Sequence, residues 1–238
     1  MNMIRCGDYE ALSHAAAEFV ARQIKEKPSS VLGLPTGATP LGMYSRLVAL
    51  CRNEALDFSG VTTFNLDEYY PIKRDDRQSY YYFMHTHLFS GVNIKKENVH
   101  IPNGETADPE AECAGYERRI AQSGGIDLQV LGIGQNGHIG FIEPGEALES
   151  ATHVTALTPN TIAANARFFE SAACVPTKAL TMGIGTIMRA RKILILVSGK
   201  EKTAPLQALA DGKITPKIPA TILNAHGDVT LITDQPAF

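Results

Sequence analysis

The sequence predicts an α/β protein with a Rossmann-like, three-layer, open and mainly parallel sheet, helices on both faces and a lid segment. Short apolar runs alternate with helical patterns along the chain, which is the element order of a parallel α/β sheet. The apolar runs are nearly continuous, as expected of strands buried on both faces. With 44% hydrophobic residues the chain can form a sizeable core. We therefore expect residues 1–238 to be one domain with a lid at about 145–176.

The expected elements follow one another through most of the chain. Strands are expected at 31–34, 61–66, 127–134, 192–199 and 229–233. Helices are expected at 8–26, 40–51, 78–89, 108–123 and 200–211, with another near 160–170. Local signals mark two of the helix starts, since Asp108 can cap the helix that Pro109 opens, and Thr39 can cap one opened by Pro40.

The composition excludes several classes of protein. A net charge of −3 without clustered basic residues disfavours nucleic-acid binding. No apolar run is long enough to span a membrane, and the charged N-terminal segment lacks the apolar core of a signal peptide. The four cysteines show no zinc-type spacing, so we interpret them as reduced thiols. A cytoplasmic protein without membrane or nucleic-acid partners is expected.

Polar or glycine-rich motifs follow four of the expected strands. They are LPTGATP (34–40), LDEYY (66–70), GIGQNGHIGFIEP (132–144) and SGKEKT (198–203). In an open α/β sheet, ligands bind beyond the carboxyl ends of the strands. The four motifs are therefore expected to meet at one edge of the sheet and to form one site there.

The first and last of these motifs predict an anion site. Gly37 gives the loop backbone freedom, and the helix that follows offers N–H groups and a positive dipole end to a phosphate. The candidate cations nearby are Lys200, Lys202 and Arg167. The alternatives are an ordinary strand-to-helix turn and solvated surface charges, because no Walker-type GK[ST] sequence is present.

The other two motifs carry acid and base candidates. Asp67 and Glu68 follow a buried strand, and we expect one to point inward and the other outward, with Asp67 first. His138 lies between glycines that allow close backbone approach, with Glu143 five residues further on. The alternatives are a cap or surface pair and a structural histidine. One His and one Glu are too few for a metal site, so no metal is expected.

These groups suit proton transfer beside a carbonyl of a phosphorylated small molecule, and aldose–ketose isomerisation is the natural chemistry for a sugar phosphate. As a set, the motifs resemble the glucosamine-6-phosphate deaminase (glucosamine-6-phosphate isomerase) family. GLPTGATP, TFNLDEYY, GIGQNGHIGFIEP, NARFF, ALTMGIGTIM and SGKEKTAPLQAL follow the family's order between residues 33 and 210. The resemblance implies conversion of glucosamine 6-phosphate and water to fructose 6-phosphate and ammonia, without a cofactor.

The resemblance also implies a role for each matching residue. His138 opens the pyranose ring, supported by Asn136 and Glu143, and Asp67 moves a proton from C2 to C1. The phosphate is held by Gly37, Ala38, Thr39, Arg167 and Lys202. The segment between the histidine motif and NARFF acts as the lid.

The sequence departs from the family pattern at two positions and in one segment. Asn136 stands where some relatives have Asp, so the partner of His138 is neutral, and Ile142 stands where many have Asn. The stretch GEALESATHVTAL (145–157) lacks Lys and Arg, so we expect no activation by N-acetylglucosamine 6-phosphate. Cooperative kinetics that became hyperbolic on adding this effector would contradict the expectation.

Two other functions remain as alternatives. One is a hydrolase resembling 6-phosphogluconolactonase, which would need the histidine but not Asp67. The other is a non-catalytic sugar-phosphate sensor, although no basic DNA-binding segment accompanies the motifs. The sequence leaves a monomer and a small homo-oligomer equally open.

Overall fold

The computed structural model describes residues 1–53, 56–166, 169 and 171–235. The strands are β1 (Asn2–Arg5), β2 (Val31–Leu34), β3 (Thr62–Asn65), β4 (Asp67–Tyr70), β5 (Val99–His100), β6 (Leu128–Gly132), β7 (His153–Ala156), β8 (Lys178–Thr181), β9 (Lys192–Val197) and β10 (Val229–Thr233). The α-helices are α1 (Tyr9–Glu26), α2 (Leu41–Asn53), α3 (Tyr80–His87), α4 (Pro109–Gln122), α5 (Pro159–Asn165), α6 (Ile184–Met188) and α7 (Thr203–Ala210). Short 3₁₀ helices are η1 (Phe89–Gly91), η2 (Lys96–Asn98), η4 (Ala172–Cys174), η5 (Lys200–Lys202) and η6 (Pro219–Ala225).

The central sheet confirms the predicted α/β fold. Within the described residues it has seven strands in the order β1-β10-β9-β6-β2-β3-β5, and every neighbouring pair is parallel. Strands β9, β6, β2 and β3 lie side by side, and each is followed by one of the four motifs. Because parallel strands end at the same edge, the motifs converge there as predicted.

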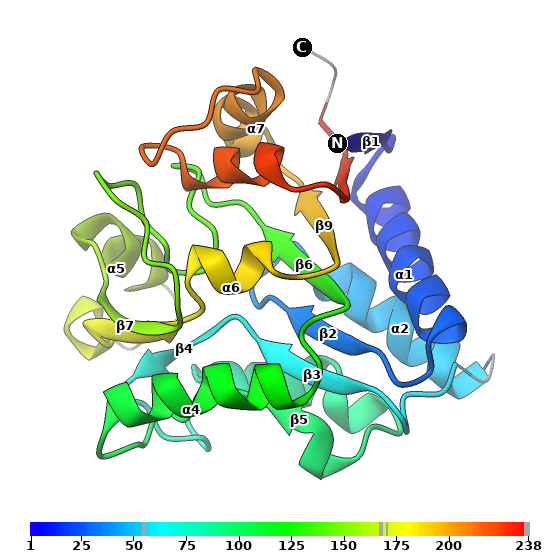
Figure 1. Cartoon of the computed structure of the whole chain (residues 1–238), viewed down its shortest axis with the longest axis horizontal. Helices are drawn as coiled ribbons and strands as arrows, with labels where there is room; N and C mark the ends of the chain where they lie inside the picture. The colour runs from blue at the N-terminus through cyan, green and yellow to red at the C-terminus, as the bar shows by residue number, and fades with distance from the viewer. Residues whose placement is uncertain (54–55, 167–168, 170, 236–238) are drawn as a thin grey trace.

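Helices cover both faces of this sheet, and each face has its own core. In Figure 1, α4 and α6 cross in front of the strands, whereas α1 and α2 lie on the other side. Strand β9 contributes to both cores, since Ile193 and Ile195 pack on the side of α4 and α6, and Leu194 packs on the side of α1 and α2. This two-sided burial explains the nearly unbroken apolar runs.

A second, antiparallel sheet was not predicted. It has the order β4-β8-β7 and pairs Asp67 with Thr181. Leu66 connects the two sheets, because its N–H donates to Leu34 O at 3.1 Å and its carbonyl accepts from Met182 N at 2.8 Å. LDEYY follows β3 as predicted, and its residues Asp67–Tyr70 form a strand of their own, β4. The segment 145–176 contains β7 and α5, and its action as a lid stays a prediction.

Helix starts follow the local signals with one exception. The Asp108 side chain accepts a hydrogen bond from Ala111 N at 3.0 Å, so this cap is confirmed. The predicted start of α2, with Thr39 as cap and Pro40 as first helical residue, is wrong by one residue, because α2 begins at Leu41. The first helical hydrogen bond, from Tyr44 N at 2.9 Å, is accepted by the carbonyl of Pro40 and not by that of Thr39. No helix in the described ranges has both the length and the apolar character needed to cross a bilayer.

Candidate active site

The glycines of the turn after β6 shape a place for the His138 ring. Gly134 donates its N–H to His138 O at 2.9 Å, and Gly137 N–H donates to Gly134 O at 3.0 Å. Gly137 has φ +85°, a backbone conformation that favours glycine. A Cβ on Gly134 would lie 2.2 Å from the imidazole of His138, so only glycine leaves room for the ring.

The side chain of Asn136 fixes the protonation pattern of the imidazole. Its Nδ2 donates to Glu143 Oε2 at 2.8 Å, because a carboxylate can only accept. The amide oxygen Oδ1 therefore faces His138 Nδ1, 2.7 Å away. Since an amide oxygen cannot donate, Nδ1 carries the proton and the neutral ring presents Nε2 as a base.

The electrostatic surroundings keep His138 neutral. Burial lowers the pKa of its imidazole, the Glu143 carboxylate opposes this shift, and the Lys202 ammonium lowers the pKa further. Glu143 Oε2 is 3.8 Å from Nδ1, beyond hydrogen-bond reach, so its hydrogen-bond link to the ring runs through Asn136 while its charge acts on the ring directly. The influence of Lys202 also shows that η5 brings its charge close to the histidine turn.

Asp67 lies against the same turn. As the first residue of β4 it is only 5% exposed, and its Oδ2 is 3.2 Å from the position that a Cβ on Gly140 would take. Gly140 is two residues after His138 and has φ +56°. Thr181 fixes the turn beside Asp67, because its Oγ1 accepts a hydrogen bond from Phe141 N at 3.2 Å. The acid of the second motif thus lies beside the turn that carries the imidazole of the third.

Glu68 is buried as well, so the expectation that one of the two carboxylates points outward is wrong. It accepts hydrogen bonds from the backbone N–H of Tyr69 at 2.9 Å, Tyr80 at 2.9 Å and Tyr81 at 2.8 Å, the last two in the first turn of α3. It therefore binds a helix N-terminus, a favourable place for a carboxylate. Burial and the neighbouring Glu68 charge together raise the pKa of Asp67 to about 8.

The loop after β2 presents its backbone N–H groups. The Tyr9 hydroxyl lies 3.1 Å from the carbonyl oxygens of Ala38 and Thr39 and accepts a hydrogen bond from Gly42 N at 2.9 Å. No group in the described part of the chain accepts a hydrogen bond from the N–H of Gly37, Ala38 or Thr39. With φ +97° at Gly37, these donors are available to an anion.

The predicted cations differ in their placement. Lys202 is half-buried, and burial lowers the pKa of its ammonium group, whereas Lys200 is exposed. Arg167 lies outside the described residues. Ile142, at the second departure from the family pattern, is 4% exposed and packs in the core on the α4 side of the sheet.

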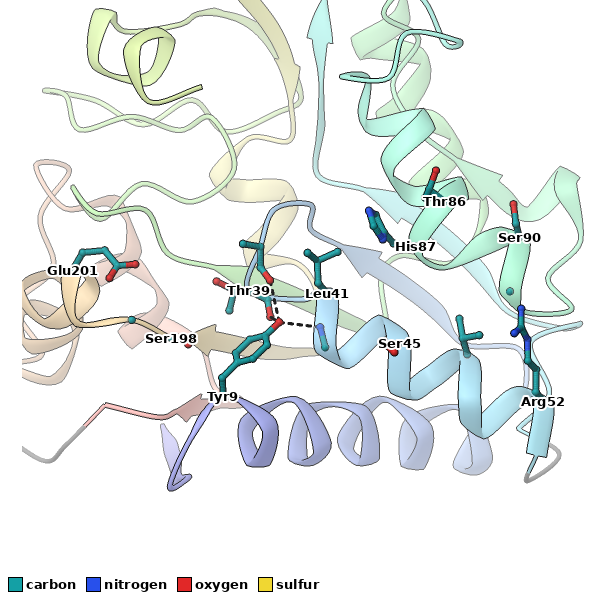
Figure 2. A pocket seen from close by; sticks show the side chains of 15 residues that line it. Tyr9, Thr39, Leu41, Ser45, Arg52, Thr86, His87, Ser90, Ser198 and Glu201 are labelled. Carbon is teal, nitrogen blue, oxygen red and sulfur yellow. Dashed lines mark hydrogen bonds between the residues drawn. The ribbon is translucent and has the colours of Figure 1, made fainter. Parts of the chain in front are cut away.

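A cavity of about 860 Å³ borders the phosphate-binding candidates but not the acid–base pair. Figure 2 shows its lining along α2, from Glu201 and Ser198 at one end, past Tyr9 and Thr39, to Arg52 at the other. Neither Asp67 nor His138 lines it. The acid and base candidates therefore lie outside this cavity.

Sequence reasoning missed two residues that shape this site. Tyr9 organises the loop after β2 although it lies near the N-terminus, and Thr181 anchors the histidine turn from β8. Neither belongs to a polar motif that follows a predicted strand.

In the described ranges, no group of three or more His, Cys, Asp or Glu side chains is arranged to hold a metal ion.

The chain matches known proteins over nearly its whole length. A family model for glucosamine-6-phosphate isomerases/6-phosphogluconolactonase matches residues 7–232. The glucosamine-6-phosphate deaminase of Thermoanaerobacter sp. (strain X514) is 56% identical over 237 residues, which are 100% of this chain and 94% of the relative. The glucosamine-6-phosphate deaminase of Clostridium perfringens (strain 13 / Type A) is 52% identical over 237 residues, which are 100% of this chain and 98% of the relative.

Solved structures give the same result. A monomeric glucosamine-6-phosphate deaminase superposes with a TM-score of 0.96 at 47% identity, covering 99% of this chain and 98% of its own. The 6-phosphogluconolactonase of Thermotoga maritima has a TM-score of 0.74 at 22% identity, over 97% and 96% of the two chains, which is a likeness of fold alone. The chain belongs to the glucosamine-6-phosphate deaminase family.

Proposed function

We propose that this chain converts glucosamine 6-phosphate and water into fructose 6-phosphate and ammonia. The observation that carries the proposal is that Asp67 lies against the glycine-rich turn that carries His138, with its Oδ2 3.2 Å from the Cβ position of Gly140. Full-length relatives that are 56% and 52% identical and are named for this activity support it.

In the proposed first step, His138 opens the sugar ring. Its unprotonated Nε2 takes the proton from the C1 hydroxyl of the pyranose, the C1–O5 bond breaks, and the proton passes to O5. The Nδ1–H bond to Asn136 holds the ring in the tautomer that this step needs. The product is the open-chain aldehyde with its amino group at C2.

In the second step, Asp67 moves a proton between neighbouring carbons. Its carboxylate takes the proton from C2 while O1 gains a proton, which gives the enolamine. Asp67 then returns the proton to C1 and the amino nitrogen gives up a proton, which leaves an imine at C2. Water adds to C2 and ammonia leaves, which produces the ketose. A pKa of about 8 suits this role, since a general base works best near the operating pH.

The phosphate end is assigned to the loop after β2 and to the basic side chains beside it. The N–H groups of Gly37, Ala38 and Thr39 would bind phosphate oxygens, and Lys202 would supply a positive charge. Arg167, implied by the family pattern, belongs to the same proposal. A solved relative described as monomeric favours the monomer among the states left open, and light scattering on the purified chain would decide this.

Ammonia release tests the proposal. Purified chain supplied with glucosamine 6-phosphate should release ammonia and fructose 6-phosphate in equal amounts. A chain that instead hydrolyses 6-phosphogluconolactone, and keeps this activity as Asp67→Asn, is a lactonase. A chain that binds the sugar phosphate without converting it is a sensor.

A further inference from the structure

A continuous series of hydrogen bonds leads from the histidine ring into the 145–176 segment. His138 Nδ1 donates to Asn136 Oδ1, and Asn136 Nδ2 donates to Glu143 Oε2. The other oxygen of Glu143, Oε1, accepts a short hydrogen bond from the hydroxyl of Thr161. Thr161 Oγ1 in turn accepts from the Thr158 hydroxyl at 3.0 Å.

The position of Thr161 is set by the start of α5. Thr158 is the N-cap of this helix, and its Oγ1 accepts a hydrogen bond from Thr161 N at 3.2 Å. Thr158 therefore holds both the backbone and the hydroxyl of Thr161. The hydroxyl points at Glu143 only while α5 is seated against the histidine turn.

The contact matters because a carboxylate can rotate. Glu143 has an 11% exposed side chain, and without a partner on Oε1 its plane is free to turn. The described residues give Oε1 one hydrogen-bond donor, the Thr161 hydroxyl. With Oε1 held, Oε2 stays on the NH₂ group of Asn136, and the amide cannot flip to offer that NH₂ group to His138. One run of donors comes from His138 through Asn136 and the other from Thr158 through Thr161, and both end on the Glu143 carboxylate. Hydrogen bonds within such a run strengthen one another.

We infer that Thr161 is a positioning residue of the ring-opening step, which it supports by holding Glu143 and, through Asn136, the Nδ1–H tautomer of His138. The expected effect of Thr161 on kcat rests on the proposed function. Its expected effect on the His138 tautomer rests on the hydrogen-bond geometry alone. It gives the 145–176 segment a chemical task, because seating α5 completes the set of groups that prepare the imidazole.

Thr161→Val tests this with little change in shape, since it replaces one hydroxyl by a methyl group. Thr161→Ser restores the hydroxyl. Thr155→Val is a matched control in the same segment, because among the described residues the Thr155 hydroxyl bonds only to Ala156 O, at 3.5 Å. Two quantities are measured on the full chain: kcat for ammonia release from glucosamine 6-phosphate, and the ¹⁵N spectrum of His138, which distinguishes the two neutral tautomers.

Thr161→Val should lower kcat by about tenfold, the loss expected for one hydrogen bond to a charged group, and should mix the tautomers of His138. Thr161→Ser should recover both readings, and Thr155→Val should match the wild type. An unchanged His138 spectrum in folded Thr161→Val overturns the inference, even if kcat falls. If the wild type releases no ammonia, the proposed function fails, and the spectra alone decide on Thr161.

Discussion

Replacing Asp67 with asparagine should abolish most of the activity and at the same time stabilise the protein at alkaline pH. Asparagine keeps the shape of the side chain but cannot take the proton from C2. Removing a general base of this kind lowers kcat by about 10²- to 10⁴-fold. The two effects have one cause: burial beside Glu68 raises the pKa of the Asp67 carboxyl group, which makes its carboxylate both a stronger base and costly to hold in the folded protein.

The effect on stability follows from the pKa of Asp67. The folded carboxyl keeps its proton up to about pH 8, whereas an exposed carboxyl in the unfolded chain loses it near the ordinary value of 3.8. Between these values the folded state binds one proton more than the unfolded state, so the free energy of unfolding falls as the pH rises. The pKa of Asp67 differs by about four units between the folded and unfolded states, so the free energy of unfolding is lower by as much as about 5 kcal/mol above pH 8.

Urea unfolding at several pH values measures this difference. Asp67→Asn should match the wild type near pH 4 and exceed its stability increasingly towards pH 8. Asp57→Asn is a control that should change stability in the opposite direction, lowering it as the pH rises. Hydrogen bonds from Ser59 and Asn93 lower the pKa of that exposed carboxyl, so its charged form is favoured in the folded protein. An Asp67→Asn variant that keeps wild-type activity would refute the catalytic role, and one that is less stable than the wild type at pH 8 would refute the account of its burial.

Three further substitutions test the histidine turn and the phosphate end. Gly134→Ala should lower kcat by more than about tenfold, because its Cβ would displace the His138 ring. Gly132→Ala should keep kcat, because nothing lies within 4 Å of the Cβ that it adds. Equal activities of the two variants would contradict the geometry of the histidine turn. Glu143→Gln should lower the pKa of His138, because the carboxylate charge raises it, and an NMR titration that shows no decrease would count against this contact. Lys202→Gln should raise KM for glucosamine 6-phosphate and weaken inhibition by inorganic phosphate; unchanged values would remove the lysine from the phosphate site.

The central sheet could be predicted because its signals are local. The apolar run of β9 is long enough to be recognised on its own, and its two faces are buried by two different cores. Strands β1 and β5 were missed, since they have four and two residues and lie at the sheet edges. The second sheet was missed because β4 pairs with β8, more than a hundred residues further along the chain.

The site was predictable in its residue types but not in its internal contacts. Asp67 and His138 stand out in the sequence because they follow predicted strands, and the parallel order of the strands brings the two motifs to one edge of the sheet. The burial of Glu68 could not be predicted, because it depends on α3 placing two N–H groups on its carboxylate. The same holds for the amide orientation of Asn136, which Glu143 fixes, and for the approach of Thr161 from α5.

A crystal structure of Asp67→Asn with glucosamine 6-phosphate tests the central claim most directly. The account predicts the C1 hydroxyl within hydrogen-bond reach of His138 Nε2, C2 beside the side chain at position 67, and the phosphate on the N–H groups of Gly37, Ala38 and Thr39. A sugar bound elsewhere, for example in the cavity along α2, or with C2 remote from position 67, would contradict it.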